Sequence, residues 1–402
     1  MTLTSSPDVE EQFPRPEPSH SPALLRNHQF AAAVAVLLFG LVALGQLLQL
    51  RADLSDQPQL TTQAVRISQL QAEVTQAGRL AAVATVGGTG STELEASLKA
   101  ASMLVVQAAA AGADAGRLAA INASLGEYAH LLRQAAATGS EPAKASTLLT
   151  SADKVLTGSL QPALSELQAG IGQQAAAANW LGWALAAGGI AVIAVIAWGW
   201  FRSSQLSHRV INPGLAIATV LVAGLTVLVV GTATSASGAA SSDAVRQAVD
   251  LVSVQSGVET SARLQAEAVL ATRFTADQVS AEEEARMTSS KAIDESTPDD
   301  VRLAASTAVD NLKDSAALLA KSSWTQAAAI LTGASGSTLP NNLSALDKAC
   351  TAAGDELVTS AEAAPQGAAI TLLVAAVGVG VLAVAAAVAV IWGFAARLKE
   401  YQ

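Results

Sequence analysis

The sequence predicts an all-α membrane protein with four transmembrane helices and two extracytoplasmic helical bundles in a tandem repeat. Of the 402 residues, 51% are hydrophobic and only 14% are charged, which is too apolar for an ordinary soluble protein of this length. Alanine is abundant and aromatic residues make up only 3%, so helices are favoured over strands. Four apolar runs reach about 20 residues or more, the length at which a helix crosses the hydrocarbon core of a bilayer.

The four apolar runs divide the chain into an ordered series of segments. The N-terminal tail is rich in proline, serine and acidic residues, a composition typical of a disordered segment that could dock a partner. The first run is long, and no convincing A-x-A cleavage site for a signal peptidase precedes Arg51. We therefore favour a signal anchor over a secretory signal. We expect a disordered cytoplasmic tail at 1–28, transmembrane helices at 29–50, 179–201, 213–235 and 368–394, extracytoplasmic bundles at 51–178 and 236–367, a cytoplasmic hairpin loop at 202–212 and a cytoplasmic tail at 395–402.

The second apolar run has the strongest membrane signature. Trp180 and Trp183 lie at one end of it, and Trp198, Trp200 and Phe201 lie at the other. At a rise of 1.5 Å per residue, these aromatic groups are separated by roughly 30 Å, the thickness of the hydrocarbon core. None of the four runs has an Asp, Glu, Lys or Arg in its interior, whereas transporters usually place ionisable groups at membrane depth.

The polar stretch between the second and third runs contains Arg202, His208 and Arg209. It ends in Asn212 followed by Pro213, a typical N-cap followed by proline at the first position of a helix. We therefore interpret the stretch as a hairpin loop between two membrane helices. Its candidate signalling residues are Arg202, His208 and Arg209.

Positively charged residues indicate the orientation, because lysine and arginine in short loops mark the cytoplasmic side. The two arginines of the hairpin loop agree with Arg26 before the first run and with Arg397 and Lys399 after the last. Arg51 goes against the pattern. We expect a multi-pass protein of the cell membrane with both termini in the cytoplasm and both long segments outside it.

The two long segments at 51–178 and 236–367 are nearly equal in length, which suggests the tandem repeat. Clusters of glycine, serine and proline at 87–91, 138–142 and 333–336 mark the ends of helices inside them. Between these breaks, apolar residues recur at spacings of three and four. Each segment is therefore predicted to form a bundle of about four helices.

Several functional classes are disfavoured by the composition. The net charge of −10 and the lack of a basic cluster argue against nucleic-acid binding. Cys350 is the single cysteine, so it forms no intramolecular disulfide, and we expect a small buried residue there. The acidic run at 282–284 is expected to be a solvated helix face rather than a cation site.

Catalytic and metal-binding patterns are also missing from the sequence. No nucleophile elbow and no Cys/His pairing is present. The histidines have no metal-ligand spacing. We therefore expect no enzyme, no metal and no cofactor. The four histidines are His20, His28, His130 and His208.

Two stretches of sequence carry a resemblance to a known family. Residues 127–135 (EYAHLLRQA), followed by 146–149 (STLL) and 160–164 (LQPAL), resemble the tyrosine-to-leucine-proline-alanine block of the actinobacterial membrane proteins called GlnX. The hairpin at 209–215 (RVINPGL) is similar to theirs as well. The plan of four spans and two outer helical segments extends the resemblance over nearly the whole chain, with Tyr128 as its motif position.

The resemblance implies a membrane component of the PknG/GlnH amino-acid sensing system. Such a component works with an extracytoplasmic solute-binding lipoprotein of the glutamine/glutamate type and relays to a soluble serine/threonine protein kinase. No ligand-binding residue is carried over from the family. The expected function is that of a non-enzymatic transmembrane sensor or relay for an amino-acid signal.

Two other functions remain open from the sequence. The protein could be an envelope scaffold whose acidic segments hold other membrane or wall proteins. A transporter subunit is a weaker alternative, because the spans lack internal charge. The spans also offer small residues that would suit either a homo-oligomer or packing within one chain. These residues include Gly188, Gly189, Gly378 and Gly380.

Overall fold

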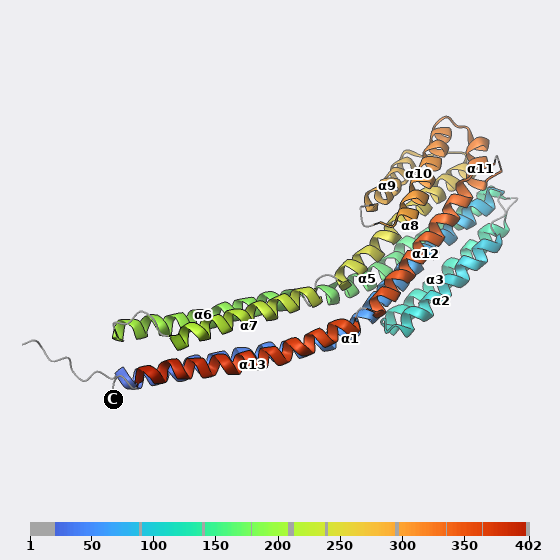
Figure 1. Cartoon of the computed structure of the whole chain (residues 1–402). Helices are drawn as coiled ribbons and strands as arrows, with labels where there is room; N and C mark the ends of the chain where they lie inside the picture. Colours follow the sequence, from blue (N-terminus) through green and yellow to red (C-terminus); the bar gives the residue numbers. More distant parts are fainter. Residues whose placement is uncertain are drawn as a thin grey trace, which may run out of the picture. The chain divides into compact units, whose positions relative to one another are not determined.

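The computed structural model confirms the all-α class (Figure 1). It describes residues 21–87, 91–138, 141–177, 179–207, 213–237, 240–293, 297–334, 336–363 and 365–398, and these contain no β-strand. The helices are α1 (Ser21–Thr85), α2 (Ser91–Ala110), α3 (Ala115–Ala137), α4 (Pro142–Val155), the π-helix η1 (Leu156–Leu160), α5 (Gln161–Ala177), α6 (Asn179–Ser207), α7 (Pro213–Ser237), α8 (Ala240–Ala271), α9 (Ala276–Ala292), α10 (Asp299–Ala320), α11 (Trp324–Thr332), α12 (Leu339–Ala363) and α13 (Pro365–Leu398).

The chain forms two compact units. The first, here called the span unit, comprises Met1–Leu48, Gly182–Thr232 and Leu373–Gln402. The second, here called the bundle unit, comprises Gln49–Leu181 and Ala233–Leu372. Helices α1, α6, α7 and α13 contribute residues to both units.

Three helices of the described residues are long and apolar enough to cross a membrane. The apolar stretches are Gln29–Gln49 in α1, Pro213–Thr232 in α7 and Ile370–Ala396 in α13, close to three of the four runs identified in the sequence. In α6 the described apolar stretch, Ala186–Phe201, is shorter than a span. The three long apolar helices suggest a membrane protein, and the fourth span stays a prediction.

Close helix packing in the span unit depends on glycine. A Cβ atom at Gly189 in α6 would overlap the side chain of Thr226 in α7. A Cβ atom at Gly214 in α7 would overlap the backbone of Gly393 in α13. Small residues at such crossings let backbones approach closely, which is how helices associate where lipid removes the hydrophobic driving force.

The span-unit glycines singled out in the sequence have different surroundings. Gly188 would place a Cβ 3.3 Å from Phe39, and Gly378 would place one 3.6 Å from Leu228. At Gly380, no neighbouring atom lies within 4 Å of the position that a Cβ atom would take. Close packing within the chain therefore accounts for Gly188 and Gly189, whereas Gly378 has room for a Cβ atom and Gly380 has an open surface.

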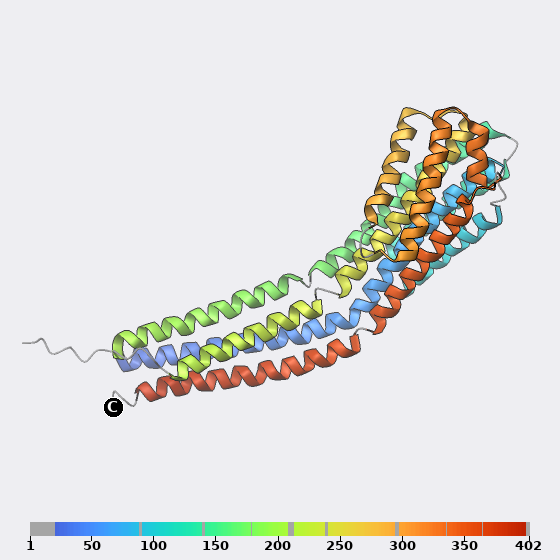
Figure 2. The ribbon, with the colours of Figure 1, turned by 45° about the horizontal axis from the view of Figure 1, so that its top comes forward.

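Large apolar side chains cover the outside of the span unit. Such a surface is costly in water and is typical of a surface that faces lipid. Figures 1 and 2 show α1 lying beside α13, and Gln29 Nε2 of α1 donates a hydrogen bond to the Ile391 carbonyl oxygen of α13 at 3.2 Å. The exposed apolar residues include Phe30, Leu38, Leu41, Ile190, Val220, Val227, Val374, Val381 and Trp392.

The bundle unit differs from the two separate bundles expected from the sequence. Both long segments contribute to one hydrophobic core, with Leu70 and Leu125 from the first and Val254, Leu312 and Leu346 from the second. Helix α8 packs on α4 and α5 as well as on its own neighbours α9, α10 and α12. The physical reason is that alanine-rich helices carry few large apolar side chains, so a small bundle made from one segment would bury little surface.

A π-helical turn joins α4 to α5. The N–H of Gln161 donates to the carbonyl oxygen of Leu156, five residues earlier. Pro162 follows directly, and its ring would clash with the carbonyl group four residues before it in a regular α-helix. The wider turn accommodates this proline and lets the helix continue into α5.

Candidate functional site

A polar pocket lies in the bundle unit among helices α1, α2, α8 and α12. Its volume is about 220 Å³, well above the roughly 10–15 Å³ that a single water molecule needs. Ala72 and Gln255 at its floor are buried, whereas Met103, Gln107 and Thr351 at its rim are exposed. The pocket is therefore open to solvent and large enough for a small molecule.

Glu73 on α1 is the first acidic side chain of this pocket. Ser97 of α2 donates its hydroxyl to Glu73 Oε2 at 2.7 Å. Burial raises the pKa of Glu73 to about 7, against the lowering effect of the Ser97 hydrogen bond, and Asp347 and Glu259 raise it further. Glu73 therefore exchanges a proton near neutral pH, as groups in binding sites often do.

Asp347 on α12 is the second acidic side chain of the pocket. Gln255 of α8 donates its Nε2 to Asp347 Oδ1 at 3.0 Å. Burial raises the pKa of Asp347, while the hydrogen bond from Gln255 and the charge of Arg79 oppose this rise. Two carboxyl groups from different segments of the chain thus line one pocket.

A buried ion pair lies deeper in the same interior. Arg79 of α1 donates its Nε to Glu259 Oε2 of α8, and the two residues are 6% and 0% exposed. Burial raises the pKa of Glu259, and Arg79 opposes the rise. Glu73 interacts electrostatically with Glu259 and Asp347, and the charge of Arg79 acts on Glu259 and Asp347.

Tyr128, the motif position of the family resemblance, is a packing residue of this core. It is among the largest fully buried side chains, and its hydroxyl donates to the Val74 carbonyl oxygen at 3.2 Å. A Cβ atom at Gly78 would lie 2.5 Å from the Tyr128 hydroxyl oxygen, so glycine there admits the ring. Burial raises the pKa of Tyr128, which keeps the phenol neutral.

A second buried arginine lies near Tyr128. Arg263 of α8 donates its Nη1 to Asp153 at 2.8 Å and to Glu267 at 2.9 Å. Asp153 belongs to α4, at the turn before the π-helix η1. The contact with Asp153 joins the two segments of the bundle unit, as the Arg79–Glu259 pair does, whereas Glu267 lies on α8 itself.

The acidic run at 282–284 is only partly solvated. Glu283 and Glu284 are exposed, as expected. Glu282 is buried, and it accepts hydrogen bonds from Ser261 at 2.6 Å and from Gln265 at 3.0 Å. The expectation was wrong for Glu282, because this residue lies on the face of α9 that packs against α8.

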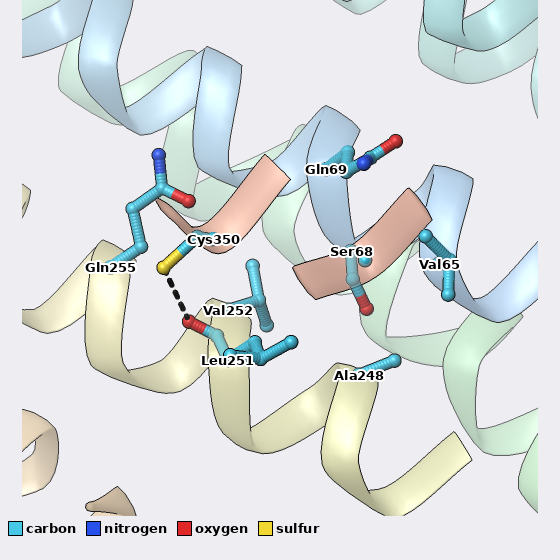
Figure 3. A pocket seen from close by; sticks show the side chains of 9 residues that line it. Val65, Ser68, Gln69, Ala248, Leu251, Val252, Gln255 and Cys350 are labelled. Carbon is cyan, nitrogen blue, oxygen red and sulfur yellow. Dashed lines mark hydrogen bonds between the residues drawn. The ribbon is translucent and has the colours of Figure 1, made fainter. Parts of the chain in front are cut away.

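A much smaller pocket of about 20 Å³ lies beside Cys350 (Figure 3). It has room for about one water molecule, and Gln69 and Gln255 line both this pocket and the larger one. The Cys350 Sγ lies 3.9 Å from the Leu251 carbonyl oxygen. Burial raises the pKa of Cys350 to about 12, so the thiol is protonated and unreactive. The prediction of a small buried cysteine is confirmed.

Of the signalling residues predicted in the hairpin loop, only Arg202 belongs to the described residues, and it is not among the residues that line this pocket. Arg202 lies within α6, which ends at Ser207, so the predicted loop at 202–212 begins too early. Residues 202–207 (RSSQLS) contain no proline or glycine, so the local sequence gives no signal that would end the helix earlier. His208 and Arg209 lie outside the described residues.

Sequence analysis did not identify the pocket or the buried ion pairs. The missed residues are Glu73, Arg79, Glu259, Arg263 and Asp347. One signal was available: Arg79 is followed by the apolar stretch 80–86 (LAAVATV), where a charged residue is expected to be paired if buried. Glu259 lies in a mixed stretch (SVQSGVETSARL, 253–264) that gives no such signal. Comparisons with protein-family models, curated proteins and solved structures give no match for this chain, so function is inferred from the geometry above.

Proposed function

We propose that this protein is a non-enzymatic transmembrane sensor, which receives a small ligand in the bundle unit and relays a signal across a membrane. The polar pocket is the observation that carries the proposal. Its walls come from both segments, α1 and α2 from the first and α8 and α12 from the second. A ligand there can favour one packing of the segments over another only by binding that packing better.

The pocket-lining helices are next to the apolar helices in the chain. Helix α1 carries both the apolar stretch Gln29–Gln49 and the pocket residues Arg66, Gln69 and Glu73. Helix α8 follows the apolar helix α7, and α12 precedes the apolar helix α13. A shift of these helices on ligand binding could therefore reach the spans through the chain itself.

The proposal includes the expected topology and partners. It has four spans, both termini in the cytoplasm and both long segments outside it. The resemblance to GlnX proteins supports an amino-acid signal, an extracytoplasmic solute-binding lipoprotein and a cytoplasmic serine/threonine kinase. The hairpin loop with Arg202, His208 and Arg209 is the proposed contact for the cytoplasmic partner.

An envelope scaffold is the second candidate, and a surface feature favours it. A hollow of about 590 Å³ runs between α10 and α12. Leu303 on its wall is 69% exposed, so a protein that filled the hollow would cover an apolar side chain. A scaffold would use such a hollow to hold another envelope protein permanently.

An in-cell cross-linking capture separates the two functions. The protein is tagged at its C-terminus and recovered from cells grown with and without added glutamate or glutamine, and the co-purifying proteins are quantified. A sensor predicts a binding protein or kinase whose recovery changes with the amino acid. A constant set of wall or division proteins would favour the scaffold and reject the relay.

A variant of the polar pocket tests whether the captured partners depend on that pocket. Glu73→Gln keeps the size of the side chain and removes its charge. If the change in partner recovery depends on the pocket, we expect Glu73→Gln to weaken that change. The exposed acid Glu284 on α9 provides the matched control, since Glu284→Gln removes the same charge away from the pocket.

A further inference from the structure

Arg66, a cation in the wall of the polar pocket, already has hydrogen-bond partners. Arg66 donates its Nη1 to Gln69 Oε1 at 2.7 Å and to Asp355 Oδ1 at 2.8 Å. Glu73 accepts from the Ser97 hydroxyl, and Asp347 accepts from the side-chain amides of Gln255 and Gln76, all of which are neutral donors. The pocket therefore has an excess of negative charge.

Buried polar atoms without a partner also occur in this interior, and they are of both kinds. Among the described residues, Glu259 Oε1 and Gln76 Oε1 lack a hydrogen-bond donor, and Gln69 Nε2 lacks an acceptor. Of these three residues only Gln69 lines the pocket. The two carboxyl groups of the pocket wall, rather than the unpaired acceptors, therefore favour a positively charged ligand.

One part of the pocket wall is apolar. Ala72 of α1 lines the cavity together with Ala100, Met103 and Leu104 of α2. These side chains offer a surface for methylene groups, and methionine adapts to ligands of different shape. A wall that combines apolar side chains with two acids suits an organic cation better than a strongly hydrated metal ion.

We infer that this pocket binds a small organic cation, a primary amine or diamine, whose ammonium group lies between the carboxylates of Glu73 and Asp347. The inference rests on the proposed function in one respect, since it names the ligand class of the proposed sensory pocket. A free α-amino acid binds less tightly than the amine, because Arg66 is already paired with Asp355 and no other cation lines the described pocket for the carboxylate.

The bound amine competes with a proton on Glu73. The charged groups around Glu73 are Asp347 on α12, Glu259 on α8 with its partner Arg79, and Arg66 on α1, while α2 presents the neutral Ser97. Since the pKa of Glu73 is about 7, its carboxylate is mostly protonated at pH 6 and mostly ionised at pH 8. Amine affinity is therefore about tenfold weaker at pH 6 than at pH 8.

Isothermal titration of the full-length protein in lipid nanodiscs tests the inference. The probes are n-butylamine and 1,4-diaminobutane, with 1-butanol as the uncharged analogue, glutamine as the zwitterion and magnesium chloride as the metal ion. We expect the amines to bind more tightly than the other three, with about a tenfold loss of affinity from pH 8 to pH 6.

Variants identify the site. Glu73→Gln is expected to weaken amine binding about tenfold at pH 8 and to remove its dependence on pH. Met103→Lys places a cation at the rim, where the side chain is 52% exposed, and is expected to weaken binding without disturbing the fold. The control Glu284→Gln is expected to bind like the wild type.

Three results would overturn the inference. They are the absence of amine binding by the folded wild type at about 10 mM and pH 8, binding of 1-butanol or magnesium as tight as that of the amines, and binding of glutamine that is tighter than that of n-butylamine. The last result would leave the proposed sensor intact, because partner recovery in cells could still follow the amino acid. Amine binding with constant partner recovery would support the inference and reject the relay.

Discussion

The span unit and the bundle unit are both built from alanine-rich helices, but they are held together differently. In the span unit, helices meet where side chains are absent, as at Gly189 and Gly214. In the bundle unit, helices from the two segments are joined by buried charged pairs, as at Arg79 and Glu259. The first kind of contact is independent of pH and the second is not, so only the bundle unit can couple its packing to charge.

The largest expected effect comes from breaking the buried ion pair. Arg79→Met leaves Glu259 fully buried without its partner, where it must either take up a proton or carry an unpaired charge, and this costs about 3–5 kcal/mol of unfolding free energy. Denaturant unfolding of the protein in detergent, followed by circular dichroism, measures this loss. The double variant Arg79→Met with Glu259→Leu is expected to recover most of it, because no unpaired charge remains. A loss below about 1 kcal/mol in the single variant would contradict the structure.

The next effect tests the glycine contacts of the span unit. Gly214→Ala introduces a Cβ against the backbone of Gly393, and overpacking of this kind costs about 1–3 kcal/mol. Gly224→Ala in the same helix α7 is the matched control, since no atom lies within 4 Å of its Cβ position. Melting temperatures in detergent are expected to fall for Gly214→Ala only. Equal behaviour of the two variants would argue against the close crossing.

A smaller effect is the pH dependence of the bundle unit through Glu73. Its pKa is raised from 4.5 to about 7 in the folded protein, so the folded state holds a proton that the unfolded state has released. This contribution is fully present below about pH 4.5 and is lost as the pH rises to about 7. It amounts to roughly 1–3 kcal/mol. Glu73→Gln is expected to flatten the corresponding part of the stability profile between pH 5 and pH 8, and an unchanged profile would refute the assignment.

The smallest effect is expected at an exposed ion pair of the same unit. Arg133 donates its Nε and Nη2 to the two carboxylate oxygens of Glu95 at 2.7 and 3.0 Å, and this joins α3 to α2. Both side chains are about half exposed. Glu95→Gln is expected to cost less than about 1 kcal/mol and to matter less in high salt. A loss as large as that of Arg79→Met would remove the distinction between buried and exposed pairs.

Composition and periodicity were sufficient to predict the elements of this fold. The apolar runs at 29–50, 213–235 and 368–394 match helices that can span a membrane, because length and hydropathy alone identify them. Pro213 begins α7 as expected. Glycine clusters mark helix ends because Gly87, Gly112 and Gly333 have positive φ angles, which glycine adopts at little cost. These are local properties of the chain.

The arrangement of the bundle unit and the pocket were beyond sequence analysis. The pocket needs Glu73 and Asp347 to meet from opposite segments, and nothing in their local sequence indicates this pairing. The inward position of Glu282 depends on the face that α9 turns toward α8. The sharing of one core by both segments depends on how much surface alanine-rich helices can bury, which is a property of the assembled unit.

The long separation of Arg79 and Glu259 has a consequence for biosynthesis. The two residues are 180 positions apart in the chain, and at about 5–20 residues per second a ribosome needs roughly 10–40 s to make that length. During this interval Arg79 has no carboxylate to meet, and the first segment cannot close its core. A nascent chain that stops before Glu259 is thus expected to remain open to proteases, so completion of the second segment controls whether the first one survives.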